Sequence, residues 1–159
     1  MHEMLEQSEI SLISNSPIDT ESIAKIIGGN LHGGEVIELA SDLGGGKTLF
    51  TSGLVSGAGS IDQVSSPTFM ISKVYKCPKF VIHHFDFYRL SEPGIVALEL
   101  QEVMNEPKTV IVLEWAGIVK NVLPEKLLRI EIEHAGEEKR KLKFYIPKEL
   151  EYLIQGIKN

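Results

Sequence analysis

The distribution of apolar and polar positions predicts alternating strands and helices in the first part of the chain. Alternation over residues 9–13 predicts a strand, and the apolar, β-branched run at residues 36–40 predicts a second, buried strand. Between them, Thr20 stands where a helix cap is expected. The apolar residues after Thr20 predict a helix that is ended by Gly28 and Gly29.

Two later runs are more strongly apolar. The segment FVIHHFDFY, residues 80–88, predicts a strand whose alternation places His84 and Asp86 on the same face. The segment TVIVLEW, residues 109–115, predicts a fully buried strand with Glu114 at its carboxyl end. Each run therefore carries an acidic side chain near its carboxyl end.

The remaining pattern completes an α/β arrangement. Residues 93–103 predict a short helix with Ile95, Leu98 and Val103 directed inward, and a strand is permitted from Thr68 onward. At the end of the chain the pattern predicts a hairpin and a closing helix, at residues 127–133, 142–146 and 147–157. Alternating strands and helices followed by a β-rich end predict an α/β fold with a mixed sheet, in a single domain over residues 1–159.

The composition is that of an ordinary globular protein, with 43% hydrophobic and 24% charged residues. No run approaches the roughly 18 apolar residues that a membrane helix requires. We therefore expect a cytoplasmic protein with no membrane contact. The single cysteine, Cys77, has no internal disulfide partner, which suits a reducing compartment, and we interpret it as structural.

The charge limits the possible partners. A formal net charge of −6 argues against a protein that grips nucleic acid alone, because such binding depends on Lys and Arg neutralising phosphates. One basic run, KRKLK at residues 139–143, is an exception. We interpret it as a solvated strand edge rather than a docking patch.

A glycine-rich loop joins the second strand to a segment that can be helical. Gly44, Gly45 and Gly46 have no side chains to block a close approach to the backbone, and Lys47 and Thr48 follow directly. Convergent backbone N–H groups, the positive end of a helix and a lysine in its first turn describe a phosphate cradle, in which Thr48 would be a hydroxyl ligand to Mg²⁺. The alternative is a glycine-rich turn without function, which adjacent glycines between a strand and a helix disfavour.

The phosphate-binding pattern G-x-x-x-x-G-K-[ST] is incomplete here. Ser41 stands where its first glycine is expected. A serine held at positive φ would cost on the order of 1 kcal/mol, unless the loop leaves the strand by a different turn. The cradle is therefore expected, while the conformation of its first corner is open.

A magnesium ion that bridges two phosphates usually also needs a carboxylate, and the chain offers two candidates. Asp86 and Glu114 lie near the carboxyl ends of predicted strands, where open α/β sheets bind ligands. Either alone could be an ordinary acid at a strand end, but the cradle in the same chain favours function. Asp86 could orient or deprotonate an attacking water, and Arg89 or Arg140 could neutralise the developing charge. His84 is interpreted as a hydrogen-bonded structural residue rather than a catalytic one.

Four motifs in order resemble a known family. They are ASDLGGGKT, VSSPTF, HFDFYRL and VLEW. The series is similar to the bacterial ATPase family TsaE, also called YjeE, over residues 20–140. The resemblance implies a small P-loop-type α/β domain that binds ATP with Mg²⁺ and hydrolyses it weakly by itself. It also implies work with TsaB and TsaD proteins in making threonylcarbamoyladenosine in tRNA.

Transferred position by position, the resemblance implies roles for single residues. Lys47, Asp86 and Glu114 are expected to be catalytic, and Thr48 and Glu114 to hold Mg²⁺. The residues expected at the nucleotide are Thr20 with its neighbour Glu21, Gly44, Gly45, Gly46, Lys47, Thr48, Leu49 and Arg140.

Two further positions are expected beside the site, and two depart from the family pattern. Thr68 would line a loop next to the γ-phosphate, and Trp115 would flank the site. Ser41 replaces a glycine, and Leu49 stands where a second threonine is common. The departures bear on nucleotide affinity and on the contact with the α-phosphate.

Two functions from different classes follow. The first is a Mg²⁺-dependent ATPase of tRNA threonylcarbamoylation, and the acidic charge agrees with it because partner proteins would hold the tRNA. The second is a nucleotide-dependent binding module that docks on a partner and barely turns over, which Ser41 favours. A small-molecule kinase is disfavoured because no lid-like arginine-rich segment is visible. The lack of an N-K-x-D motif weakly disfavours GTP.

Overall fold

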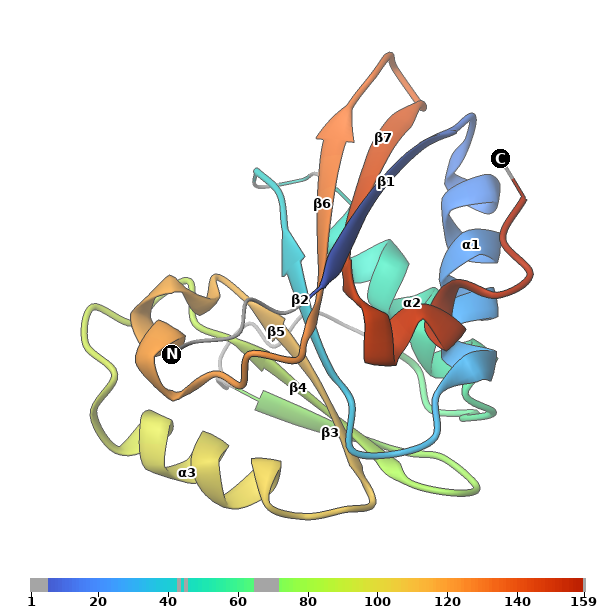
Figure 1. Cartoon of the computed structure of the whole chain (residues 1–159). Coiled ribbons are helices and arrows are strands. Elements are labelled where there is room, and N and C mark those ends of the chain that lie inside the picture. The colour runs from blue at the N-terminus through green and yellow to red at the C-terminus, as the bar shows by residue number, and fades with distance from the viewer. Residues whose placement is uncertain (1–5, 43, 45, 65–71, 159) are drawn as a thin grey trace.

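The computed structural model describes residues 6–42, 44, 46–64 and 72–158. Its strands are β1 (Gln7–Ser14), β2 (Val36–Ala40), β3 (Ser72–Lys76), β4 (Val81–Asp86), β5 (Thr109–Glu114), β6 (Leu128–His134) and β7 (Arg140–Pro147). Its helices are α1 (Pro17–Asn30), α2 (Lys47–Gly57) and α3 (Gly94–Met104), with two 3₁₀ helices, η1 (Ala116–Val122) and η2 (Lys148–Ile154). Figure 1 shows how these elements are arranged.

The strands form one sheet in the order β1-β7-β6-β2-β5-β4-β3. The middle is parallel, since β2 pairs with β5 and β6 in this sense and β4 pairs with β5. The outer pairs β1–β7, β6–β7 and β3–β4 are antiparallel. The prediction of an α/β fold with a mixed sheet is confirmed, and so is the hairpin of β6 and β7.

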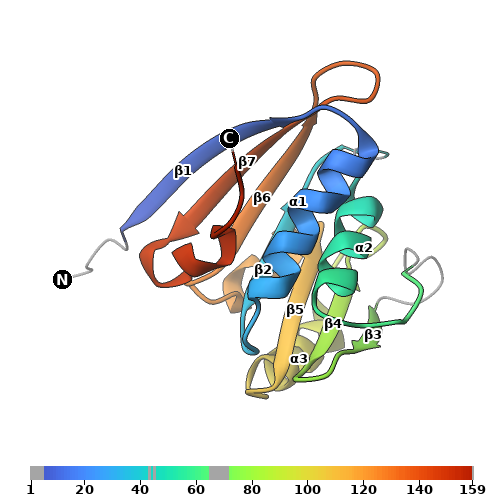
Figure 2. The ribbon, with the colours of Figure 1, turned by 90° about the vertical axis from the view of Figure 1, so that its right-hand side faces the viewer.

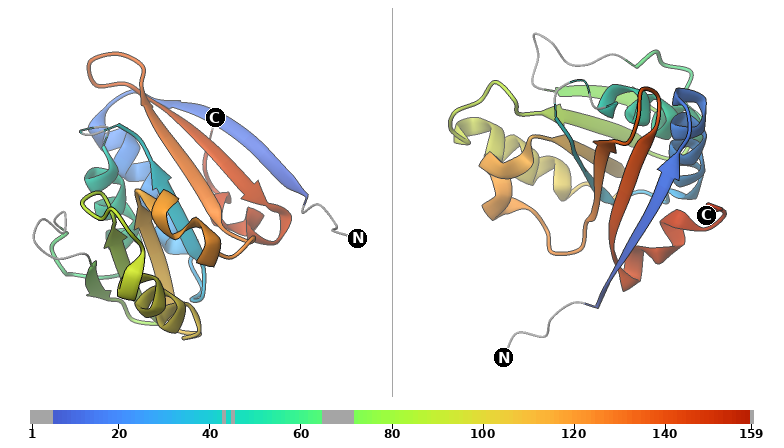
Figure 3. Two further views of the ribbon diagram at one scale, coloured as in Figure 1. Left: turned by 90° about the vertical axis from the view of Figure 1, so that its left-hand side faces the viewer. Right: turned by 90° about the horizontal axis from the view of Figure 1, so that it is seen from above.

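Helices cover the two faces of the sheet unequally. α1 and α2 lie side by side over one face (Figure 2), where Ile37, Leu39 and Val112 join them in the larger apolar cluster. α3 and η1 cover the opposite face of β4 and β5, where Phe85 and Leu113 belong to a smaller cluster. In the described part of the chain, β6, β7 and β1 extend beyond these two helices on that face (Figure 3).

α1 begins earlier than its sequence pattern predicts. Ser16 is the N-cap, and its hydroxyl oxygen accepts a hydrogen bond from the backbone N–H of Asp19 at 3.1 Å. Pro17 takes the first helical position, which suits its fixed φ and missing N–H. Thr20 lies buried within the helix, and its hydroxyl contacts that of Ser14. The prediction that Thr20 is the cap is therefore wrong.

Glycine serves close packing rather than termination in α1. The prediction that Gly28 and Gly29 end the helix is wrong, because α1 continues to Asn30. A Cβ on Gly28 would lie only 2.2 Å from the carbonyl oxygen of Leu54 in α2. The missing side chain lets the two helix backbones approach each other.

The inward face of α3 also differs from the prediction. Ile95 and Leu98 are 74% and 61% exposed, whereas Leu100 is fully buried. Val103 packs against the smaller apolar cluster as predicted. The helix is rotated so that Leu100, rather than Leu98, contacts the sheet.

The basic run at residues 139–143 does not lie at a sheet edge. β7 is paired on both sides because β1, from the start of the chain, takes the outer position. Lys143 Nζ lies 4.0 Å from Glu9 Oε1 on β1. The interpretation as a strand edge is therefore wrong.

The end of the chain differs in helix type and extent. The closing segment forms the 3₁₀ helix η2 and ends at Ile154, before the predicted limit at residue 157. Over the described ranges, no helix has both the length and the apolar character needed to cross a membrane.

Candidate functional site

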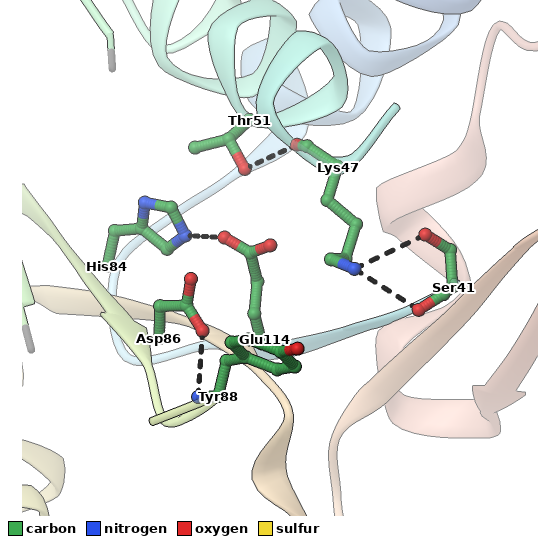
Figure 4. A network of polar contacts seen from close by, with 7 residues as sticks. All are labelled: Ser41, Lys47, Thr51, His84, Asp86, Tyr88 and Glu114. Carbon is green, nitrogen blue, oxygen red and sulfur yellow. Dashed lines mark hydrogen bonds and ion pairs between the residues drawn. The ribbon is translucent and has the colours of Figure 1, made fainter. Parts of the chain in front are cut away.

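The parallel strands end beside the start of α2. In the register of the sheet, Glu114 at the end of β5 lies opposite Leu39 of β2 and opposite Asp86 of β4. The predicted acids are therefore neighbours, although of their two strands β5 is adjacent to β2, which leads into the glycine loop, and β4 is not. Figure 4 shows both carboxylates below the first turn of α2, with Lys47 between them and Ser41.

The glycine loop adopts left-handed backbone at two positions. Gly44 has φ 76°, and Gly46, the N-cap of α2, has φ 107° and ψ 15°. Residues that carry a Cβ disfavour these backbone angles. Lys47 and Thr48 are the first two residues of α2, where backbone N–H groups lack partners within the helix. Gly45 lies outside the described residues.

Ser41 is not strained. Among the described non-glycine residues, positive φ occurs only at Trp115. The loop therefore leaves β2 without a left-handed corner at Ser41. Its hydroxyl donates to the carbonyl oxygen of Asp42 at 2.8 Å.

Lys47 is buried, with 8% of its surface exposed, and its ammonium group is engaged. Nζ donates to the carbonyl oxygen of Ser41 at 3.1 Å and lies 3.4 Å from its hydroxyl oxygen. The same nitrogen lies 4.8 Å from the centroid of the Trp115 ring, within the range of a cation–π interaction. The carbonyl oxygen of Lys47 accepts a hydrogen bond from Thr51. These contacts hold a positive charge at the mouth of the glycine loop.

Trp115 follows Glu114 directly and has φ 55° and ψ 47°. A bulky residue in this region stores backbone strain of roughly 1–3 kcal/mol, a feature that clusters at functional sites. Its ring lies 5.0 Å from that of Tyr88, between centroids. Sequence reasoning missed this aromatic pair, because the two residues are brought together only by the pairing of β4 with β5.

The two carboxylates differ in their surroundings. Glu114 is 3% exposed, and its Oε2 lies 2.5 Å from His84 Nε2. Asp86 is partly exposed, and its Oδ1 accepts a hydrogen bond from the backbone N–H of Tyr88 at 3.0 Å. Burial raises the pKa of the Asp86 carboxyl above its ordinary value, so this carboxylate is a stronger base than a fully exposed one.

Of the two candidate arginines, Arg140 lies at the glycine loop. A Cβ on Gly46 would be 4.0 Å from Arg140 Nε. Its Nη1 donates to the carbonyl oxygen of Lys139 at 2.9 Å. Arg89 is exposed beyond the end of β4. The position of Arg140 follows from the β7 pairing.

The other residues predicted to contact the nucleotide differ in their surroundings. The Thr20 hydroxyl is occupied by Ser14, which pairs with Arg140 across β1 and β7. Thr48 is exposed at the start of α2, and Leu49 is partly buried. Thr68 lies outside the described residues.

A hollow of about 240 Å³ opens on the side of Lys47 that faces β6. Residues that line it include Ala40, Ser41, Lys47, Trp115, Ala116 and Arg129. Arg129 Nη1 lies 2.9 Å from Glu38 Oε2, and this ion pair forms one wall. Neither residue was singled out from the sequence, since a charge on a strand carries no local signal of a cavity.

The donors suit a hard cation only if a ligand completes its coordination. Within the described ranges, no group of three or more His, Cys, Asp or Glu side chains is arranged to hold a metal. The Thr48 hydroxyl and the Glu114 carboxylate supply oxygens, which Mg²⁺ prefers. Such an ion usually keeps waters and takes phosphate oxygens as further ligands. The residues present therefore fit a magnesium ion that arrives with a nucleotide.

Comparison with known proteins gives the family. The family model described as "Threonylcarbamoyl adenosine biosynthesis protein TsaE" matches residues 14–142, most of the chain. The chain belongs to the TsaE family. The resemblance seen in the four motifs is thereby confirmed.

Individual TsaE proteins are similar over most of their length. The chain is 36% identical over 129 residues to the tRNA threonylcarbamoyladenosine biosynthesis protein TsaE of Bacillus subtilis, covering 81% of this chain and 80% of the relative. It is 34% identical to the protein of the same name from Rickettsia prowazekii, covering 79% and 88%. The crystal structure of Bacillus subtilis YdiB superposes with a TM-score of 0.72 and 29% identity, covering 96% of this chain and 94% of that one.

Proposed function

We propose that this chain is a Mg²⁺-dependent ATPase of the machinery that makes threonylcarbamoyladenosine in tRNA, working with TsaB and TsaD homologues. The observation that carries the proposal is the glycine loop at the start of α2, with buried Lys47 beside the neighbouring carboxylates of Asp86 and Glu114. Membership of the TsaE family supports the tRNA-modifying role. The net charge of −6 supports contact with tRNA through the partners rather than alone.

The parts of the site have separable tasks in this proposal. Backbone N–H groups at the start of α2 bind the phosphates, and Lys47 and Arg140 add positive charge at the loop. Thr48 and Glu114 hold Mg²⁺. The bound ion would neutralise charge that develops on the terminal phosphate.

Asp86 is the proposed acid on which hydrolysis depends. Its raised pKa and its place beside Glu114 suit a carboxylate that orients a water molecule and accepts its proton. The backbone N–H of Tyr88 fixes one of its oxygens. The other oxygen makes no hydrogen bond with the described residues, and in this proposal it is the one that faces the water.

The experiment compares nucleotide binding with turnover. Calorimetry with ATP and Mg²⁺ measures binding, and phosphate release measures hydrolysis by the full chain alone and with TsaB and TsaD homologues. Asp86→Asn should keep nucleotide binding and lose about 10²–10⁴-fold in partner-stimulated hydrolysis. Glu133→Gln, at an exposed position of β6, is the matched control and should match the wild type.

Two results would contradict the proposal at different points. Undiminished hydrolysis by Asp86→Asn would remove this residue from catalysis. Absence of ATP or ADP uptake, by the isolated chain and by its assembled complex, would remove the nucleotide function itself.

A binding module with little turnover is the second candidate. The contacts of Lys47 Nζ with Ser41 and with the Trp115 ring favour it, because this ammonium group must exchange them for phosphate. Nucleotide-dependent capture of the partners without faster hydrolysis would support the module over the ATPase.

We also propose that the protein works in the cytoplasm. Cys77 is a free cysteine and is partly buried, and a protein of a reducing compartment keeps such a thiol.

A further inference from the structure

A buried histidine touches the carboxylate that the proposed function assigns to magnesium. His84 is fully buried, and Glu114 is 3% exposed. The proposed function uses Glu114 but gives no task to His84. Figure 4 shows the imidazole ring and the Glu114 carboxylate pointing toward each other, with Asp86 beside them.

The sheet register brings these side chains to one face. β4 and β5 run parallel, with Asp86 opposite Glu114 and His84 opposite Val112. Because side chains alternate along a strand, His84, Asp86 and Glu114 all project toward α2. His83, the preceding residue, projects to the opposite face, where its ring stacks on Phe85 with centroids 4.3 Å apart.

The direction of the hydrogen bond follows from the chemistry of the pair. His84 Nε2 lies 2.5 Å from Glu114 Oε2. A carboxylate that binds a metal ion is ionised and can only accept, so in that state Nε2 carries the hydrogen and donates it. A buried carboxylate without such a donor would be costly to keep charged.

Within the described ranges, the contact uses one of the two oxygens of the Glu114 carboxylate. In the described part of the chain, Glu114 Oε1 accepts no hydrogen bond. His84 Nδ1 likewise finds no partner among the described residues, so the polar contact of this ring is with Glu114.

We propose that His84 is a positioning residue, which holds the Glu114 carboxylate in the orientation that meets Mg²⁺ at the bound nucleotide. The inference rests on the proposed function. Carboxylates that bind metals are commonly oriented by a hydrogen-bond donor behind them, and loss of that donor weakens the metal about 10–100-fold. The donor therefore sets magnesium affinity without touching the nucleotide.

The experiment titrates magnesium against nucleotide binding in the full chain. His84→Leu removes the donor, and His84→Gln keeps an N–H group at nearly the place of Nε2. The matched control is His83→Leu, one residue away on the other face. Binding of a fluorescent ATP analogue is measured across a magnesium series and in EDTA, and circular dichroism checks that each variant is folded.

The expected pattern separates positioning from packing. His84→Leu should raise the half-saturating magnesium concentration about 10–100-fold and leave metal-free nucleotide affinity within about twofold. His84→Gln should recover most of the loss, because its amide donates where the imidazole did. His83→Leu should follow the wild-type magnesium curve.

Three outcomes overturn the inference. A wild-type magnesium curve in His84→Leu removes the positioning role alone. Failure of His84→Gln to recover any affinity assigns the residue to packing. A wild-type protein whose nucleotide binding ignores magnesium overturns both this inference and the proposed function.

A spectroscopic measurement decides the matter if His84→Leu does not fold. Nitrogen NMR of the wild-type imidazoles should show His84 with its hydrogen on Nε2. Adding Mg²⁺ to the ATP-bound protein should shift the His84 signals and leave those of His83 in place. A hydrogen on Nδ1 alone, or no response to Mg²⁺, would overturn the inference.

Discussion

The charged side chains at the site are each held in place by contacts with neighbouring residues. Lys47 is held by Ser41 and by the face of Trp115, and Glu114 by His84. Ser41 occupies a glycine position of the family pattern without adopting a glycine conformation. Replacing Ser41 by glycine therefore tests for backbone strain. Relief of strain would raise the free energy of unfolding, whereas added flexibility of the unfolded chain would lower it.

Ser41→Gly should destabilise the protein. Ser41 has no positive φ to relieve, so glycine mainly adds freedom to the unfolded chain, at a cost of about 0.4–1 kcal/mol. The free energy of unfolding in urea measures the change. A gain in stability would mean that the serine is strained after all.

His83 should make stability depend on pH. Burial lowers the pKa of its imidazole, so below the ordinary value of 6.5 the unfolded chain binds more protons than the folded one. The free energy of unfolding should therefore rise with pH, from the lowered pKa up to about 6.5, and level off above it. His83→Phe should keep the stacking on Phe85 and lose a fraction of a proton from this slope.

The outcome that contradicts this prediction is a slope that stays the same in His83→Phe. Denaturant titrations at a series of pH values between about 5 and 8 provide the comparison, with wild type and variant measured under the same salt conditions.

The helices are specified by features that hydrophobic patterning does not show. The start of α1 depends on the Ser16 cap, and its distance from α2 depends on Gly28. Each feature concerns the backbone, since one satisfies an N–H group and the other removes a side chain. Both can be tested by single substitutions with a neighbouring control.

Ser16→Ala should cost about 1 kcal/mol of stability. The change removes the acceptor for the Asp19 backbone N–H at the helix start. Thermal and urea unfolding measure it. Ser22→Ala is the control, because the exposed Ser22 hydroxyl bonds within the helix to the carbonyl oxygen of Ile18 and caps no free N–H group. An equal effect of the two substitutions would contradict the assignment of the cap.

Gly28→Ala and Gly29→Ala should change stability in opposite directions. At Gly28 the new methyl group would meet the Leu54 carbonyl oxygen at 2.2 Å, so the helices must separate, at a cost of about 1–3 kcal/mol. At Gly29 the nearest atom is 3.7 Å away, and alanine should gain up to about 1 kcal/mol from helix propensity. Calorimetric melting of both variants tests the difference, which a similar response would refute.

The molecule as a whole is organised around the carboxyl ends of β2, β5 and β4. The parallel centre gathers the glycine loop and both acids at one end, while the antiparallel β1–β7–β6 part brings Arg140 to the same loop. A ligand that bridges these elements should therefore stabilise the entire fold and not one segment.

ATP with Mg²⁺ should raise the melting temperature. At a nucleotide concentration about 100 times Kd, binding to the folded state contributes about 2.7 kcal/mol. For a chain of 159 residues this is about 5–10 °C. Differential scanning fluorimetry measures the shift, and Lys47→Ala should abolish most of it. A shift of the same size in Lys47→Ala would indicate binding elsewhere.

The sequence by itself determined the strands of the core, the mixed α/β class, the glycine loop and the family. Apolar periodicity and glycine-lysine spacing are local, so residues 36–40, 109–115 and 44–48 can be recognised without knowing their neighbours. His84 and Asp86 could be assigned to one face for the same reason, because alternation is a property of a single strand.

Only the tertiary structure decided which residues meet. The contact of His84 with Glu114, the pairing of Trp115 with Tyr88 and the approach of Arg140 to Gly46 depend on strand order and register. Strand order and register are set by the burial of the apolar surface of the whole chain. Burial over the whole chain also placed β1 outside β7 and rotated α3 so that Leu100 is buried. The local sequence pattern did not determine either feature.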